Sequence, residues 1–254
     1  MPNLLLEEMT WPEIRDALEA GSQSVLLPVA SVEQHGPALP LNTDVVIGRA
    51  LAVRTAQELG DALVGPVLVP GCSDHHMSWP GTITLPASLL VAVVTECVRS
   101  LARHGFREIV VLPTHGGNFS PLASGMPEIR RAAAGARVID LADSKAFFGA
   151  WFRVLHKFGR RDETLPHADV METSLMLYLR PELVRSEYLA PGYTGQLDLE
   201  ELTRKGLAAF TKNGVLGDPR GASPELGRAL LEEVSRYLAE EIRKRRAPRT
   251  GKLT

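Results

Sequence analysis

The sequence predicts an α/β fold, with a mainly parallel sheet that carries helices on both faces. Short apolar runs rich in β-branched residues alternate along the chain with longer segments of helical periodicity. The short runs also lack strict apolar–polar alternation, which is typical of strands buried on both faces. The chain has 254 residues, of which 44% are hydrophobic. That length can bury one large core, so we expect a single domain over residues 1–254.

The elements follow in order from the amino terminus. A helix is expected to begin after Thr10, because Thr is a favoured cap, Pro12 lies in the first turn and Glu13 follows three residues after the cap. The segment 143–166 is rich in aromatic residues and then turns charged, so we expect a helix followed by a lid-like loop. The remaining pattern predicts strands at residues 25–32, 62–69, 109–112 and 137–141, and helices at residues 45–59, 89–103, 121–134, 169–179 and 224–246.

Composition narrows the class of protein. The formal net charge of −2 gives no electrostatic reason to expect nucleic acid or an anionic membrane as a partner. No apolar run approaches the roughly 20 residues that span a bilayer, and residues 1–20 lack the basic-then-apolar order of a signal peptide. The two cysteines, Cys72 and Cys97, have no metal-type spacing and fit a reducing compartment. We therefore expect a cytoplasmic protein.

Histidines and carboxylates follow the predicted strands. Ligands of open α/β sheets bind beyond the carboxyl ends of the strands, so these side chains should meet at one rim. Glu33 and His35 are two residues apart, so on an extended backbone their side chains project to the same side. A carboxylate has two oxygens and can bridge a metal pair about 3.5–4 Å apart. Imidazole and carboxylate without thiolate favour Zn, Mn or Fe. The residues are Glu33, His35, Asp44, His115 (followed by Gly116, Gly117 and Asn118), His167 and Glu172.

Each of these residues also has a structural interpretation. Asp44 could cap its helix, and Glu172 has capping-box spacing from Asp169. Alone, His115 is more often a hydrogen-bonded buried histidine, and Glu33 could be an exposed loop residue. Jointly the pattern favours a metal site, because five of the seven histidines lie in turn-rich segments between elements: His35, His75, His76, His115 and His167. His104 and His156 have only structural interpretations.

Several blocks, in the same order along the chain, resemble the creatininase (creatinine amidohydrolase) family. They are residues 28–44 (which include Glu33-Gln34-His35-Gly36-Pro37), 71–83, 115–118 (His-Gly-Gly-Asn), 167–174 and 214–219. The resemblance covers most of the chain and is nearer to the His-Gly-Gly-Asn members than to creatinine-cleaving enzymes. It implies a three-layer αβα sandwich, a hydrolytic site with two divalent metal ions, and commonly a homohexamer.

The resemblance also implies roles for individual residues. Glu33 and His115 would hold one metal ion, His35 and Glu172 the other, and Asp44 would bridge them. His167 would orient the substrate or pass a proton to the departing nitrogen. The side chain of Asn118 and the backbone amides of Gly116 and Gly117 would bind the oxyanion. His76 and Trp151 would line the substrate site.

The implied reaction is hydrolysis of the C–N bond of a small cyclic amide, formamide or peptide-derived amide by a metal-activated hydroxide. Three positions depart from the family pattern. Gly117 stands where creatinine-cleaving members carry a glutamate ligand, which argues against creatinine itself. His75 stands where a glutamate is usual, and Pro113 where an asparagine is usual.

Two alternatives remain open. A metal-dependent hydrolase could open a keto-inositol-type ring at a C–C bond, which a polar, hydroxyl-binding pocket would favour. The chain could also be a catalytically retired protein that still binds metal, although the intact ligand set argues against this. A nucleotide-binding Rossmann module is excluded, because the turn after the first strand lacks the Gly-x-Gly-x-x-Gly pattern.

Overall fold

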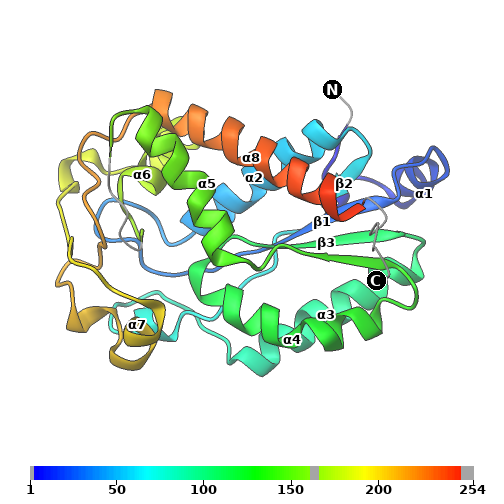
Figure 1. Cartoon of the computed structure of the whole chain (residues 1–254), viewed down its shortest axis with the longest axis horizontal. Coiled ribbons are helices and arrows are strands. Elements are labelled where there is room, and N and C mark those ends of the chain that lie inside the picture. Colours follow the sequence, from blue (N-terminus) through cyan, green and yellow to red (C-terminus); the bar gives the residue numbers. More distant parts are fainter. Residues whose placement is uncertain (1–2, 161–165, 247–254) are drawn as a thin grey trace, which may run out of the picture.

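Four parallel strands form the central sheet in the computed structural model, which describes residues 3–160 and 166–246 (Figure 1). β1 (Ser24–Val29) and β3 (Glu108–Pro113) lie in the middle, β2 (Ala62–Val64) and β4 (Arg137–Asp140) lie at the edges, and the order is β2-β1-β3-β4. Neighbouring strands are paired from their first residues onward. The carboxyl ends of all four therefore point to one rim, as the sequence predicts.

Helices cover both faces of the sheet (Figure 1). Leu26 and Val110 pack on one face against α2, α5, α6 and α8, whereas Val25 and Ile109 pack on the other against α1, α3 and α4. Strand side chains are thus buried whichever way they point, which explains the missing polar alternation. This confirms the three-layer αβα sandwich. The helices are α1 (Trp11–Glu19), α2 (Thr43–Leu59), α3 (Ala87–Arg103), α4 (Phe119–Ala132), α5 (Ser144–Lys157), α6 (Val170–Leu179), α7 (Leu199–Lys205) and α8 (Pro224–Arg246).

Two strands end earlier than their apolar runs. β2 was expected to reach residue 69 but stops at Val64, because Gly65 and Pro66 follow and proline has no N–H to donate to a neighbouring strand. β1 was expected to reach residue 32 but ends at Val29. Residues 30–32 lie beyond the strand and lead the chain to the rim; Ala30 and Ser31 are still buried, and Val32 is half-buried.

Local signals account for several helix boundaries. The capping box at α1 is confirmed, since the backbone N–H and the hydroxyl of Thr10 both donate to Glu13 Oε2 at 2.6 Å. The helical part of the aromatic segment is α5, while residues 161–165 of the expected lid-like loop lie outside the described residues. Helix α7 was not expected; Asp198 caps it by accepting from the backbone N–H of Glu201. Among the described residues, no helix is long and apolar enough to span a membrane.

Short 3-10 helices connect the larger elements. They are η1 (Leu6–Glu8), η2 (Asp74–His76), η3 (Gly116–Asn118), η4 (Pro181–Leu183), η5 (Ser186–Tyr188) and η6 (Leu207–Ala209). Two of them, η2 and η3, contain residues of the ordered blocks identified above and lie at the carboxyl rim of the sheet. They therefore shape the site rather than the core.

Candidate functional site

The five residues predicted as metal ligands lie together at the carboxyl rim. Glu33 and His35 follow β1, Asp44 is in the first turn of α2, His115 follows β3, and Glu172 is in the first turn of α6. All are buried except Glu172, whose side chain is 18% exposed. The parallel strands thus bring together residues that are up to 139 positions apart in the chain, from 33 to 172.

Asp44 stands between two histidines. Its Oδ1 is 3.3 Å from His35 Nε2, and its Oδ2 is 3.2 Å from His115 Nδ1. Each histidine also faces a second carboxylate: Glu172 Oε2 is 3.7 Å from His35 Nε2, and Glu33 Oε1 is 3.3 Å from His115 Nδ1. The arrangement consists of two half-sites, Glu33–His115 and His35–Glu172, that share Asp44.

The half-sites contain lone pairs without hydrogen-bond partners. Among the described residues, Glu33 Oε2, His35 Nε2 and Asp44 Oδ2 are buried and accept or donate no hydrogen bond. Leaving such atoms unpaired in the interior is costly. The other ring nitrogens are already used: His35 Nδ1 donates to the Glu33 carbonyl (3.1 Å), and His115 Nε2 lies 3.1 Å from the Cys72 carbonyl. The converging oxygens and nitrogens therefore fit a divalent cation, with outer partners that orient each imidazole.

The two histidines that face carboxylates favour a positive charge. Burial opposes protonation of His35, but the charges of Glu172 and Asp44 outweigh it and raise the pKa of His35 well above its ordinary value. His115 has a raised pKa for the same reason, with Glu33 as the main opposing charge. Burial works against ionisation of Asp44 as well, yet the charge of His35 lowers the pKa of that carboxyl. The charges around the cluster therefore favour a bound cation.

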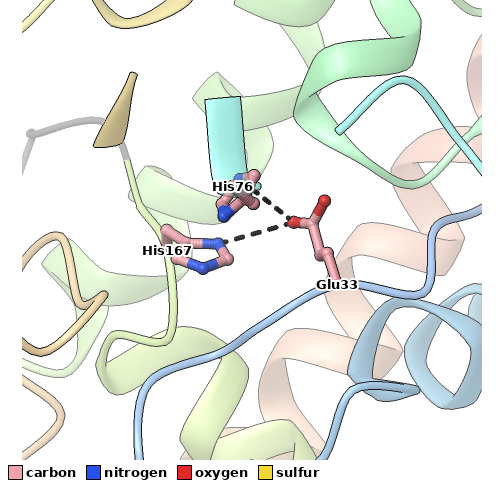
Figure 2. A group of neighbouring side chains, drawn as sticks. All are labelled: Glu33, His76 and His167. Atoms are coloured by element: carbon pink, nitrogen blue, oxygen red, sulfur yellow. Dashed lines mark ion pairs between the residues drawn. The ribbon is translucent and has the colours of Figure 1, made fainter. Parts of the chain in front are cut away.

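Two further histidines complete the cluster. His76 Nε2 lies 3.4 Å and His167 Nδ1 lies 3.8 Å from the same oxygen, Oε1, of Glu33. Figure 2 shows both rings directed at that carboxylate from different segments. Burial lowers the pKa of both imidazoles, and neighbouring histidines lower it further, above all His167 for His76 and His35 for His167. Both shifts favour the neutral imidazole.

The capping interpretations have different outcomes. Asn42 occupies the cap position of α2, and Asp44 makes no side-chain capping bond, so a cap role for Asp44 is wrong. Asp169 caps α6 by accepting from the backbone N–H groups of Met171 and Glu172. Glu172 Oε2 accepts from the backbone N–H of Ala168 at 2.5 Å, one residue before the position a capping box uses. That bond holds the Glu172 carboxylate near His35.

The oxyanion role predicted for the Asn118 side chain is wrong. Its two amide hydrogens are donated to the carbonyls of Val29 (3.1 Å) and Ala30 (3.0 Å), and its Oδ1 accepts from the backbone N–H of Cys72 (2.9 Å). The side chain is fully buried and is absent from the lining of the cavity beside the cluster. Asn118 instead ties the end of β1 to the loop that carries the second block.

A cavity lies beside the cluster. The predicted substrate-binding residues His76, Gly116, Gly117 and Trp151 all line it, as does His167. Apolar side chains from three helices also line it: Ile47 of α2, Phe147, Phe148 and Trp151 of α5, and Met171 of α6. Trp151 Nε1 is buried and has no hydrogen-bond partner among the described residues. Sequence reasoning noted the aromatic enrichment of residues 143–166 without assigning the phenylalanines to this lining.

Gly117, which lines the cavity, has no space for a side chain. A Cβ atom there would lie 2.1 Å from the Cys72 carbonyl oxygen and 2.6 Å from His115 Nε2, and 3.1 Å from His75 Cε1. This backbone therefore accepts only glycine at position 117. The ring of His75 lies over it, nearly parallel to that of His115 at a centroid separation of 6.0 Å. Burial lowers the pKa of His75 to about 3, so the imidazole there is neutral.

Comparison with known proteins agrees with this arrangement. The sequence model of the creatininase (creatinine amidohydrolase) family matches residues 7–242. The chain therefore belongs to the creatininase family, whose characterised relatives below are hydrolases. The mycofactocin precursor peptide peptidase of Mycolicibacterium smegmatis is 32% identical, over 91% of this chain and 88% of that protein. The creatinine amidohydrolase of Pseudomonas putida is 29% identical, over 97% of this chain and 98% of that protein.

Solved creatininases share the fold. A mutant creatininase of Zn-Zn type superimposes with a TM-score of 0.83 and is 28% identical, covering 98% of this chain and all of the other. A creatininase described with Mn superimposes with a TM-score of 0.80, also at 28% identity, over 97% of this chain. The match over nearly the whole length agrees with the αβα sandwich and extends to the segments that form the cluster.

Proposed function

We propose that this chain is an amidohydrolase that depends on divalent metal ions and cleaves the C–N bond of a small or peptide-derived amide with an apolar group beside it. The observation that carries the proposal is the pair of half-sites that share Asp44, with buried lone pairs open toward a cation. The cavity beside them offers apolar side chains to the substrate. The whole chain acts as one hydrolase domain in this proposal.

Two ions, of Zn, Mn or Fe, would be held by the five ligands. Glu33 and His115 would hold one ion, His35 and Glu172 would hold the other, and the Asp44 carboxylate would be shared by both. The relatives described with Zn and with Mn support this choice of metals, and so does a donor set of imidazole and carboxylate without thiolate. When bound, such ions polarise a carbonyl and lower the pKa of a coordinated water toward about 7.

The residues around the ligands divide the remaining work. His167 Nδ1 faces the cluster and is placed to take a proton and return it to the departing nitrogen. The indole N–H of Trp151, which has no hydrogen-bond partner in the described part of the chain, is a donor for a substrate carbonyl. The backbone amides of Gly116 and Gly117 line the cavity at the place where an oxyanion would develop. Phe147 and Phe148 exclude water from the reacting bond.

The alternatives are less well supported. Ring opening of a polyhydroxylated keto-inositol would require a polar pocket, whereas the lining beyond the histidines and carboxylates of the cluster includes phenylalanine, tryptophan, isoleucine and methionine. A retired metal-binding protein would have no need to keep all five ligands together with two neutral histidines. The resemblance to a precursor peptide peptidase favours a peptide-derived amide. Assembly as a homohexamer is part of the proposal by family resemblance, and light scattering on the purified protein tests it.

The proposal is tested by elemental mass spectrometry and turnover on the same preparation, purified without added metal or chelator. We expect about two equivalents of divalent metal per chain. We also expect hydrolysis of peptide amides with apolar side chains, formamides or lactams in preference to keto-inositols. Metal without turnover on any of these would indicate a binding protein. A folded chain with no metal at all would contradict the metal-dependent mechanism.

A further inference from the structure

Gln34 lies between two proposed ligands, Glu33 and His35, and its side chain is itself buried. Its carboxamide nitrogen is 2.9 Å from His76 Nδ1, 2.9 Å from His167 Nε2 and 3.1 Å from the Gly214 carbonyl oxygen. One side chain therefore contacts both His76 and His167. These contacts determine where the proton of each ring resides.

The orientation of the carboxamide follows from its other end. Gln34 Oε1 lies 2.9 Å from the backbone nitrogen of Gly36, which can only donate, so that atom is the acceptor oxygen. The opposite atom is then the NH2 group, which only donates. His76 Nδ1 must accept this hydrogen bond, so the proton of His76 is on Nε2. That nitrogen faces Glu33 Oε1 at 3.4 Å.

His167 is fixed by the backbone of the same residue. Its Nε2 is 2.8 Å from the Gln34 carbonyl oxygen, which can only accept, so Nε2 carries the proton. Nδ1 faces Glu33 Oε1 at 3.8 Å, too far for the hydrogen bond that a protonated Nδ1 would donate to a buried carboxylate, so we assign Nδ1 as the bare nitrogen. The second amide hydrogen of Gln34 goes to the Gly214 carbonyl. Each donor hydrogen thus has its own acceptor, and the approach of the Gln34 and His167 nitrogens carries no hydrogen bond.

We propose that Gln34 is a positioning residue that sets the protons of the site, so that His76 presents an N–H and His167 presents a lone pair beside the Glu33 carboxylate (Figure 2). The catalytic consequence rests on the proposed function: hydrolysis of an amide requires an acceptor for the proton of water and a donor for the charge that develops on oxygen. Gln34 sets both groups: its side chain fixes the donor N–H of His76, and its backbone carbonyl fixes the acceptor nitrogen of His167.

This proton arrangement also changes how one candidate ligand group is understood. Ligand atoms of Glu33, His76 and His167 lie within 4.8 Å of one another, close enough to hold an ion. A metal ion needs a bare imidazole nitrogen, and Nε2 of His76 is protonated. His76 is therefore a donor beside the metal centre, whereas His167 Nδ1 is free to bind an ion or a proton.

The experiment is ring-nitrogen NMR on the full-length chain labelled with 15N-histidine, loaded with zinc, which is diamagnetic. Signals are assigned with the variants His76→Asn and His167→Asn. We expect long-range proton–nitrogen correlations to show the proton on Nε2 in both rings. A proton on Nδ1 of either ring, or on both nitrogens, would overturn the proposal. The spectrum does not depend on finding the substrate, so it can succeed where the proposed function fails.

A variant tests the cause. In Gln34→Glu the carboxylate can only accept, so the proton of His76 should move to Nδ1, and kcat should fall about 10²–10⁴-fold with a smaller change in KM. Gln57→Glu, half-buried on α2 beside Arg54, makes the same charge change away from the site and should leave spectrum and rate unchanged. An unchanged His76 tautomer in a folded Gln34→Glu protein would show that Gln34 does not set it. If this variant does not fold, the wild-type spectrum still decides.

Discussion

Four histidines of the site are buried to nearly the same degree, from 1% exposed for His35 to 7% for His167, yet they form two pairs with opposite charge preferences. His35 and His115 each face two carboxylates, and their pKa values are raised. His76 and His167 face Gln34 and other imidazoles, and their pKa values are lowered. Burial alone would make all four neutral, so the neighbouring charges decide.

The difference assigns two tasks within one cavity. His35 and His115 lie among carboxylates that favour a positive charge. A divalent ion bound by these side chains would supply that charge. A pair that is held neutral, each with one proton in a defined place, suits proton transfer instead. The boundary between the pairs runs through Glu33, whose Oε1 faces His115 on one side and His76 and His167 on the other.

The largest effect is expected from Asp44→Ala. This change removes the carboxylate that both His35 and His115 face, so the first pair loses the charge that unites the half-sites. We expect metal content to fall from about two equivalents to nearly none, and activity to fall to background. Elemental mass spectrometry and turnover measure both. Asp16→Ala, on the surface of α1, is the control and should change neither. Two equivalents retained in Asp44→Ala would show that Asp44 does not bridge.

The second prediction separates the pairs directly. His35→Ala should lose at least the ion shared with Glu172, because its Nε2 faces the carboxylates of Glu172 and Asp44 and has no hydrogen-bond partner among the described residues. His167→Ala should keep the metal content and lose rate, about 10²–10⁴-fold in kcat. Metal analysis beside steady-state kinetics distinguishes them. Loss of metal from His167→Ala would place His167 among the ligands and break the division proposed here.

Much of the fold could be predicted, because the periodicity of apolar residues indicates the strands and helices and their order along the chain indicates a parallel sheet. Apolar runs buried on both faces and intervening helices lead to a parallel sheet, and the ends of its strands then locate the ligands. The end of β2 could not be located from hydrophobicity, since the apolar character continues to Val69, whereas the continuous strand ends at Val64 and beyond it only an isolated bridge pairs Leu68 with Val29. Pairing, which depends on distant backbone, decides that boundary.

The roles of two site residues, Asn118 and Gln34, could not be predicted from the sequence because they also depend on contacts with distant segments. An asparagine amide can serve a substrate or the backbone, and only the contacts to Val29, Ala30 and Cys72 show which role Asn118 has. Gln34 was missed because alternation on an extended segment directs it away from Glu33 and His35. The histidines it contacts come from residues 76 and 167, and nothing local to position 34 indicates them. Its place between two candidate ligands was the one available signal.

A third prediction concerns the space around the first pair. Gly117→Ala places a methyl group against the Cys72 carbonyl and the His115 ring, so His115 must shift. We expect a loss of about 1–3 kcal/mol in the free energy of unfolding, typical of overpacking, and weaker metal retention. The neighbouring Gly116→Ala is the matched control, because nothing lies within 4 Å of a Cβ at that position. Denaturant titration compares the two. Equal stabilities would mean that the loop relaxes freely around His115.

The smallest effect, and the most direct view of both pairs, is the pH dependence of stability after the metal is removed. His35 and His115, with raised pKa values, contribute stability that is fully present below about pH 6.5 and lost as pH rises through their folded values. His76, His167 and His75, with lowered values, destabilise the fold as pH falls below that point, and Asp44 does so further toward acid.

The metal-free chain should therefore be most stable near the ordinary histidine pKa, with an alkaline limb from His35 and His115 and an acid limb to which His76 and His167 contribute beside His75 and Asp44. Each titrating group changes the free energy of unfolding by at most about 1.4 kcal/mol per pH unit. Because a divalent ion takes the place of the protons on His35 and His115, metal loading should abolish the alkaline limb and leave the acid limb. Asp44→Ala should flatten the same limb without any metal, since it removes a charge that raises both pKa values. An alkaline limb that persists in that variant would mean that Glu33 and Glu172 alone hold the pair charged, and that the shared carboxylate is not what unites it.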